Sequence, residues 1–335
     1  MHVRFRFRSA LWVAALFAAS CGGKSPMQPP PPADSPRLVC PQPITAQSRD
    51  GGAMPVPYPN ATVVGGQSPW TLECAPHSSE IFPLGQSVVT CRISDSLNRT
   101  DSCTFTITVA PPPRVVATRY VAFGDSMSDG VLGLTKFAVG DPGPAVGYAF
   151  KLRTLLADRY TAQSFSMTDE GIGGESITAG MTRLPIVLSQ DTPEVVMLLE
   201  GINDLNGGRE AAIPAIVNGL RTMVRTVRSR GMAPFVATFP PQRPGGRRAF
   251  SAASVVPANE QVRAMVASEG AVLVDLYPVF DGHVDTLIGP DGLHPTEEGY
   301  QKMAETFFQA IRERLEERPA VPTSRLSPQT RRRGR

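Results

Sequence analysis

Residues 114–315 predict an α/β fold: a flavodoxin-like three-layer α/β/α arrangement with a five-stranded parallel sheet in the order 2-1-3-4-5. Short apolar runs of strand length alternate there with stretches whose apolar residues recur at helical spacing. This alternation is typical of a parallel sheet covered on both faces. Polar motifs follow the apolar runs, at the edge where open α/β sheets bind ligands. A small all-β sandwich is predicted before this region, at residues 37–111.

Each expected strand of the parallel sheet is an apolar run bounded by polar or turn residues. The five runs cover 119–123, 163–167, 195–199, 234–238 and 271–276. Between the third and fourth runs, apolar residues from Ile213 to Val227 indicate a helix. A last helix is expected to begin near Thr296, after Pro295, and to bury Tyr300, Met303, Ala304, Phe307 and Ile311.

The all-β module contains strand-like runs separated by Pro, Gly and Asn turns, at 63–66, 87–92 and 103–109. The last run alternates Cys103, Phe105, Ile107 and Val109 with threonines, as a half-buried strand does.

Residues 1–20 have the features of an export signal, with a basic start followed by an apolar run that is too short to span a bilayer, which takes about 20 residues. The small residues before Cys21 resemble the lipobox of bacterial lipoproteins. This resemblance implies cleavage before Cys21 and attachment of lipid there. A plain secretory peptide is the alternative. Residues 21–36 are rich in proline and predict an extended spacer.

Residues 316–335 lack apolar periodicity and are expected to form a disordered basic tail. The formal net charge of the chain is +3, but three arginines of the signal segment and six of the tail contribute to it. The remainder of the chain is therefore acidic, and nothing in it indicates nucleic-acid binding.

The five cysteines all lie in the first third of the chain. If Cys21 carries lipid, Cys40, Cys74, Cys91 and Cys103 remain, and they can form two disulfides in three ways. An exported chain favours disulfides over free thiols. Zinc binding is the alternative, although no Cys-x-x-Cys pair is present.

A serine follows the first expected strand of the parallel sheet, in the motif Gly124-Asp125-Ser126-Met127. A nucleophilic serine needs a base and a site that stabilises the oxyanion. Three polar blocks follow downstream, at 171–176 (Gly-Ile-Gly-Gly-Glu-Ser), 201–204 (Gly-Ile-Asn-Asp) and 291–294 (Asp-Gly-Leu-His). By itself Ser126 would be interpreted as the N-cap of a helix.

The four blocks in this order resemble those of the SGNH (GDSL-type) hydrolases, a family of serine esterases, lipases and acyl-sugar deacetylases. The resemblance implies that Ser126 is the nucleophile, His294 the base and Asp291 the residue that orients the base. It also implies an oxyanion hole made by the backbone N–H groups of Ser126 and Gly174 and by the side-chain amide of Asn203. It implies no cofactor.

Histidine counting agrees with this assignment. Of four histidines, His2 lies in the signal segment and His77 in the all-β module, so His283 and His294 remain to serve the serine. The sequence departs from the family pattern at two positions: Met127 stands where leucine is usual, and Asp169 where asparagine is common.

Asp281, His283 and Asp285 would share one face of an extended segment, and a metal site there is the alternative interpretation. A solvated rim beside the active site is the preferred interpretation, with His283 as a contact for substrate. No metal is expected.

The all-β module resembles the hyalin repeat, an immunoglobulin-like sandwich. The segments that carry the resemblance are 82–85, 89–91 and 102–105. This resemblance favours the disulfides Cys40–Cys103 and Cys74–Cys91, the first of which would tie the ends of the module together.

The preferred function is a serine ester hydrolase that works through an acyl-enzyme on Ser126 and is anchored to the cell envelope, on the periplasmic or outer side. Secretion is expected if the lipobox is not used. The alternatives are an O-acyltransferase with the same site and an adhesion or binding lipoprotein with a vestigial hydrolase domain. Expected partners are an ester of a carbohydrate, lipid or small molecule, a membrane through the lipid anchor, and cell wall or polysaccharide through the sandwich.

Overall fold

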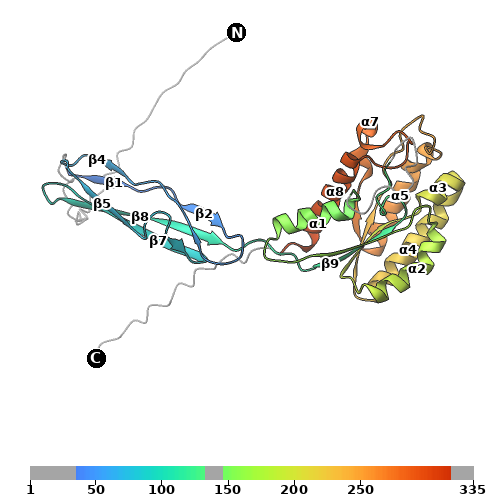
Figure 1. Cartoon of the computed structure of the whole chain (residues 1–335), viewed down its shortest axis with the longest axis horizontal. Coiled ribbons are helices and arrows are strands. Elements are labelled where there is room, and N and C mark those ends of the chain that lie inside the picture. The colour runs from blue at the N-terminus through green and yellow to red at the C-terminus, as the bar shows by residue number, and fades with distance from the viewer. Residues whose placement is uncertain (1–34, 133–145, 318–335) are drawn as a thin grey trace, which may run out of the picture. The chain divides into compact units, whose positions relative to one another are not determined.

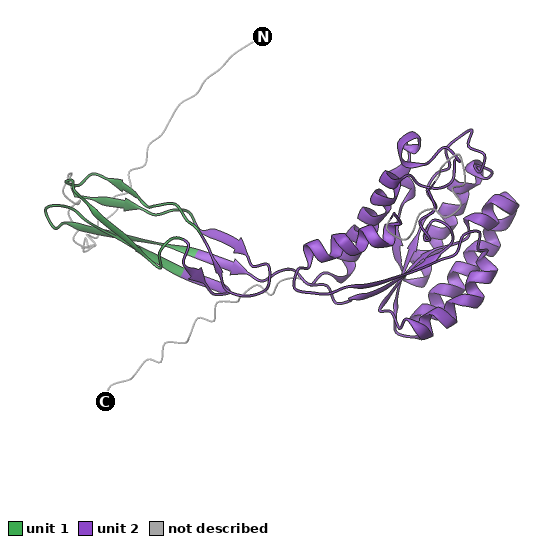
Figure 2. Cartoon of the chain, in the orientation of Figure 1, with its two compact units in different colours: residues 1–42, 57–78, 88–106 green, residues 43–56, 79–87, 107–335 purple. Residues whose placement is uncertain are grey.

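The computed structural model describes residues 35–132 and 146–317. The chain forms two compact units (Figure 2), one of residues 1–42, 57–78 and 88–106 and the other of 43–56, 79–87 and 107–335. The division passes through two strands of the all-β region, and the domain boundaries expected from the sequence stay a prediction.

Several sequence-based expectations fall outside the described residues. They are the export signal at 1–20, the lipid site at Cys21, nearly all of the spacer at 21–36, and the basic tail beyond residue 317. Among the helices of the described residues, none combines the length and the apolar character that crossing a bilayer requires.

An all-β region is present where the sequence predicted one. Its strands are β1 (Arg37–Val39), β2 (Ile44–Gln47), β3 (Met54–Pro55), β4 (Thr62–Val64), β5 (Thr71–Ala75), β6 (Ile81–Phe82), β7 (Gly85–Ser94) and β8 (Thr100–Ala110). One sheet has the order β2-β8-β7-β5, and β1-β4 and β3-β6 form two-stranded sheets. Its identity as a hyalin repeat stays a prediction.

The burial of β8 follows the predicted alternation, since Phe105, Ile107 and Val109 are buried. The strand expected at 63–66 ends two residues earlier than predicted. Strand β4 stops at Val64, because Gly65 and Gly66 have φ values of 73° and 78°.

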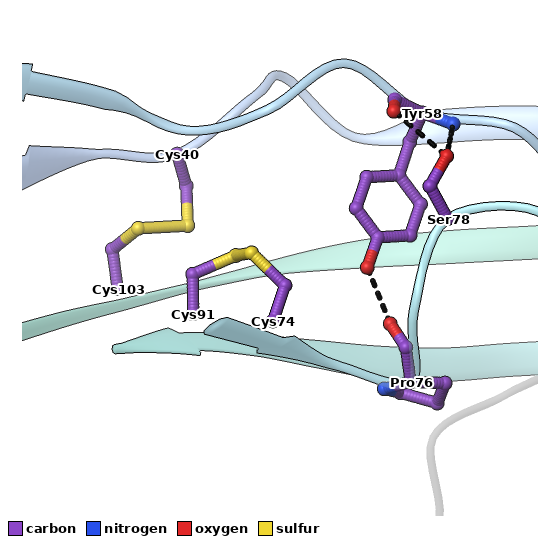
Figure 3. Close-up of a disulfide and its surroundings, with 7 residues drawn as sticks. All are labelled: Cys40, Tyr58, Cys74, Pro76, Ser78, Cys91 and Cys103. Carbon is purple, nitrogen blue, oxygen red and sulfur yellow. Dashed lines mark hydrogen bonds between the residues drawn. A yellow bond between two sulfur atoms is a disulfide. The ribbon is translucent and has the colours of Figure 1, made fainter. Parts of the chain in front are cut away.

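Both disulfides have the pairing that the resemblance implied, Cys40–Cys103 and Cys74–Cys91 (Figure 3). Cys74 and Cys91 lie directly opposite each other on β5 and β7. Beside them, the Tyr58 hydroxyl donates a hydrogen bond to the carbonyl oxygen of Pro76. The Tyr58 ring also packs edge-on against Phe105, with ring centroids 5.1 Å apart. The bridges and this ring contact together hold the strands in place.

The parallel sheet has the predicted strand order. Its strands are β9 (Arg119–Gly124), β10 (Ser166–Gly171), β11 (Val195–Leu199), β12 (Ala233–Ala237) and β13 (Val272–Val274). They are all parallel and lie in the order β10-β9-β11-β12-β13, which confirms 2-1-3-4-5.

Helices cover both faces of this sheet (Figure 1). Helices α1 (Tyr148–Arg159) and α8 (Glu297–Leu315) pack together on one face. The other face carries α2 (Ile177–Gln190), α4 (Ile213–Ser229) and α5 (Ala252–Glu269). Short helices follow β11 and β13: α3 (Ile202–Gly208), the 3-10 helix η1 (Arg209–Ala212), α6 (Tyr277–Phe280) and α7 (Val284–Leu287).

Helix α8 begins as predicted, because the Thr296 side chain accepts a hydrogen bond from the Gly299 N–H at 3.0 Å. All five apolar residues expected on its inner face are buried. The central strand β11 is buried at every residue.

The expected second strand was placed about three residues too early. It runs over 166–171, not 163–167, and none of its residues is fully buried. Because β10 is an edge strand, it tolerates the polar sequence Ser-Met-Thr-Asp-Glu-Gly, which has no apolar pattern. Strand β13 is shorter than the run expected at 271–276. The chain turns after Val274, where the N–H of Leu276 donates a hydrogen bond to the carbonyl oxygen of Val274.

Candidate active site

The turn after β9 holds Ser126 at the carboxyl edge of the sheet. Gly124 ends the strand so close to β11 that a Cβ on it would lie 2.0 Å from the carbonyl oxygen of Leu199. In the turn, the Asp125 carboxylate accepts a hydrogen bond from the Met127 N–H at 3.0 Å. No helix of the described residues begins at Ser126, so the helix-cap interpretation is wrong.

Ser126, His294 and Asp291 form a continuous hydrogen-bonded chain. The Ser126 Oγ lies 2.8 Å from His294 Nε2, and His294 Nδ1 lies 2.6 Å from Asp291 Oδ2. All three residues are buried, with 5%, 1% and 3% of their surface exposed. Because the carboxylate accepts the proton on Nδ1, Nε2 is left to accept the proton of the serine hydroxyl.

The Asp291 carboxylate is held by its own loop. Its Oδ1 accepts hydrogen bonds from the N–H groups of Leu293 and His294, at 3.0 and 3.1 Å. Burial acts to raise the pKa of Asp291, but the hydrogen bonds from the His294 ring and from these amides outweigh it, so the pKa lies below its ordinary value. Asp291 is therefore a charged partner for the imidazole at neutral pH.

A second loop supports the Asp291–His294 loop from behind. The N–H of Arg243 donates to the carbonyl oxygen of Gly292 at 3.0 Å, and the N–H of Arg248 donates to that of Asp291 at 2.8 Å. The two backbones pack so closely that a Cβ on Gly246 would lie 2.3 Å from the Gly292 Cα. This contact packs the loop of residues 243–248 against the loop that carries Asp291 and His294.

Besides Ser126, the residues expected in the oxyanion hole lie in the two segments that follow β10 and β11. Gly174 lies in the loop between β10 and α2 with a φ of 81°, which favours glycine. A Cβ on Gly173 would lie 4.0 Å from the Ser126 Cβ, so this loop passes beside Ser126. The Asn203 Nδ2, in the first turn of α3, donates to the carbonyl oxygen of Glu175 at 2.9 Å. That amide nitrogen carries a second hydrogen with which it can bind a substrate oxygen.

The segment with Asp281, His283 and Asp285 is not extended, contrary to expectation. Asp281 lies in a turn, His283 at the N-cap position of α7 and Asp285 in α7, and all three are exposed. Asp285 pairs with Arg243, with 3.3 Å between the carboxylate oxygen and Nε. The described residues contain no group of three His, Cys, Asp or Glu side chains placed to hold a metal ion.

A cavity of about 410 Å³ adjoins Asn203 and the residue before His294, and the sequence analysis did not predict it. Its lining residues are Asn203, Asn206, Arg247, Arg248, Phe250 and Leu293. Arg248 also lies beside the hydrogen-bonded chain of Ser126, His294 and Asp291, with its Nε 4.0 Å from Asp291 Oδ2. The sequence feature that could have indicated this cavity is the Pro-, Gly- and Arg-rich segment between β12 and α5.

A polar network fixes this loop to α3. The Gln242 Nε2 donates to Asn206 Oδ1 at 2.8 Å, and the Ser251 hydroxyl donates to the same oxygen at 2.6 Å. Gln242 and Ser251 are buried. The network therefore holds one wall of the cavity in place next to Asn203.

Comparisons with known proteins agree with this geometry. A sequence profile described as the GDSL-like Lipase/Acylhydrolase family matches residues 122–302, more than half of the chain. Esterase TesA of Pseudomonas aeruginosa is 26% identical over 168 residues, which are 50% of this chain and 78% of that protein. The crystal structure of a lipase/acylhydrolase from Enterococcus faecalis matches with a TM-score of 0.51 and 21% identity, covering 61% of this chain and 99% of that one. The structural match confirms the fold.

Proposed function

Because the chain belongs to the GDSL-like lipase and acylhydrolase family and is a carboxylic ester hydrolase, we propose that it cleaves its substrate through an acyl-enzyme on Ser126. The observation that carries this proposal is the buried hydrogen-bonded chain from Ser126 through His294 to Asp291.

In the first half-reaction, the Ser126 Oγ attacks the ester carbonyl carbon while His294 Nε2 takes the hydroxyl proton. A new C–O bond forms, and the carbonyl oxygen becomes an oxyanion. When the intermediate collapses, the bond to the alcohol breaks and His294 returns the proton to the departing oxygen. Water then attacks the acyl carbon while His294 Nε2 takes its proton. The bond to Ser126 Oγ breaks, His294 returns the proton to that oxygen, and the carboxylic acid leaves.

The other site residues stabilise charges that develop during these steps. The Asp291 carboxylate stabilises the imidazolium and keeps its ring in one orientation. The N–H groups of Ser126 and Gly174 and the Asn203 amide are proposed to bind the oxyanion. Support comes from the loop of Gly173 and Gly174, which passes beside Ser126, and from the second amide hydrogen of Asn203.

Trapping the acyl-enzyme tests the proposal directly. Intact-mass spectrometry after mixing with an activated ester should show one acyl group on the parent protein and none on Ser126→Ala. Ser128→Ala is the matched control, since this serine lies in the same turn and contacts Tyr148. Acylation of Ser126→Ala with unchanged stoichiometry would refute the assignment.

We infer that the chain is exported and carries lipid on Cys21. The basic and apolar pattern of residues 1–20 supports this inference, as do the two disulfides, which persist in oxidising compartments. Cys21→Ser should abolish incorporation of a labelled fatty acid and move the protein from the membrane to the soluble fraction. If Cys21→Ser partitions as the parent does, the anchor is not at this cysteine.

We also infer that the all-β region binds a polysaccharide. Support comes from a shallow cavity of about 590 Å³ lined mostly by hydroxyl and charged side chains: Thr71, Glu73, Arg92, Ile93, Ser94, Thr100, Asp101 and Ser102. Co-sedimentation with insoluble cell-wall polysaccharide should be lost in Arg92→Ala and kept in Ser126→Ala. Equal co-sedimentation of Arg92→Ala and the parent would refute this role.

A further inference from the structure

Two buried carboxyl groups lie side by side under the nucleophile turn. Gly124 and Leu199 are in register at the ends of the neighbouring strands β9 and β11, and Asp125 and Glu200 are the first residues after these strands. Each has only 1% of its surface exposed. Asp125 directly precedes Ser126, and Glu200 directly precedes the Gly-Ile-Asn-Asp block that contains Asn203.

The two carboxyl groups have very different hydrogen-bond partners. Asp125 accepts from the N–H of Met127 at 3.0 Å and from the N–H of Ile202. Among the described residues, its second oxygen has no partner, and neither oxygen of Glu200 has one. Asp125 is thus the better place for a negative charge, and Glu200 the better place for a proton.

The charged groups around Glu200 do not neutralise it. Asp125, Glu175 and Asp204 face it with negative charge, and Arg183 on α2 is the cation that acts on it. The Arg183 guanidinium is already bound to Glu175, at 2.6 and 2.9 Å, and to Glu170 at 3.0 Å. The Asp204 carboxylate accepts the N–H of Ile177 at 2.8 Å. Glu200 therefore lacks a cation of its own.

We propose that Asp125 and Glu200 share one proton at neutral pH, carried on Glu200, and that Glu200 is a positioning residue that joins the nucleophile turn to the Asn203 loop. An unpaired buried carboxylate is strongly disfavoured, and two adjacent ones more so, because each charge opposes the other. A proton on Glu200 gives the second oxygen of Asp125 the hydrogen bond that it otherwise lacks.

The direction of the pKa shifts agrees with this geometry. Burial raises the pKa of Glu200, and the nearby negative charges raise it further. Burial also raises the pKa of Asp125, while its backbone hydrogen bonds oppose that rise. The two groups interact, so the titration belongs to the pair.

The shared proton has a consequence for the reaction, which rests on the proposed acyl-enzyme mechanism. The oxyanion develops beside the N–H of Ser126 and the amide of Asn203. A second negative charge on the pair directly beneath them would oppose this oxyanion. Loss of the proton at alkaline pH should therefore lower kcat.

Glu200→Gln tests the proposal, because it keeps the shape of a protonated glutamate and cannot ionise. The folded parent holds a proton that the unfolded chain releases above about pH 4.3, so its stability falls as pH rises through the interval up to the raised pKa. Its unfolding equilibrium constant should rise, relative to that of Glu200→Gln, by up to about tenfold per pH unit between pH 5 and 9. Glu210→Gln, at an exposed position, should follow the parent.

Infrared difference spectroscopy gives a readout that needs no substrate. A protonated-carboxyl band should be present in the parent at pH 7 and absent in Glu200→Gln. The alkaline fall in kcat should also be reduced in Glu200→Gln and kept in Glu210→Gln. Absence of the band in the parent, or parallel pH profiles of stability for parent and Glu200→Gln, would overturn the shared proton. Neither result depends on whether Ser126 is the nucleophile.

Discussion

Replacing Gly124 by alanine should separate the two strands that carry the nucleophile and the Asn203 loop. The added Cβ would lie 2.0 Å from the carbonyl oxygen of Leu199 and 2.6 Å from the Ser128 hydroxyl. An ordinary carbon–oxygen contact is about 3.3 Å, so the strands must move apart by roughly 1.3 Å. The atom on β11 that the new Cβ would overlap is a backbone carbonyl oxygen, which cannot rotate away as a side chain could.

This displacement should affect activity more than folding. A shift of about 1 Å in a reacting group can lower turnover roughly a hundredfold, and overpacking of a core costs about 1–3 kcal/mol. We therefore expect Gly124→Ala to reduce kcat about a hundredfold on a soluble aryl ester. Urea denaturation should show a loss of stability of about 1–3 kcal/mol.

Gly207→Ala is the matched control. Gly207 lies in α3, and nothing stands within 4 Å of a Cβ placed on it. Alanine there should leave kcat unchanged and should stabilise the protein slightly, by up to about 1 kcal/mol. If Gly124→Ala keeps kcat within threefold of the parent, the close approach of β9 and β11 does not set the position of Ser126.

Other variants test the remaining contacts. Asn203→Ala should lower kcat by about 10²–10³ with little change in KM, because its amide acts on charge that appears only in the transition state; a change in KM alone would contradict this role. The pKa of Asp291 is lower in the folded protein than in the unfolded chain, where it is about 3.9, so the ionised carboxylate stabilises the fold above that pH. This contribution is lost as the pH falls through the pKa of the folded state. Urea denaturation between pH 3 and 6 should therefore show a weaker acid destabilisation in Asp291→Asn than in the parent. Opening Cys40–Cys103, which spans 63 residues, should destabilise the all-β region by about 4 kcal/mol and leave the kcat of the parent unchanged. A fall in kcat on mild reduction would show that catalysis depends on this bridge.

The strand order could be predicted from strong local signals, and the catalytic chain from four motifs that resemble those of the SGNH hydrolases. The apolar runs at β9, β11 and β12 are buried on both faces, so they differ sharply from the sequence around them. Ser126, Asn203 and the Asp291–His294 pair follow strands or precede α8, and parallel strands bring such positions to one edge.

What the sequence did not predict depends on the environment that distant segments create. Strand β10 has a polar sequence, and only its pairing with β9 makes it a strand. Asp281 and Asp285 alternate as in a strand, but the backbone turns between them. In the sequence, nothing distinguishes Glu200 from the other acidic residues. Its proposed protonation depends on its burial, which neighbouring segments create.

The hydrogen bond between Ser126 and His294 joins residues that are 168 positions apart along the chain. A ribosome adding about 5–20 residues per second therefore adds the serine roughly 10–30 s before it adds the histidine. Throughout that interval the growing chain has a nucleophile without its base. In the proposed mechanism, acylation waits until the last loop and α8 close on the sheet, so the order of synthesis itself keeps an unfinished chain from reacting with the esters around it.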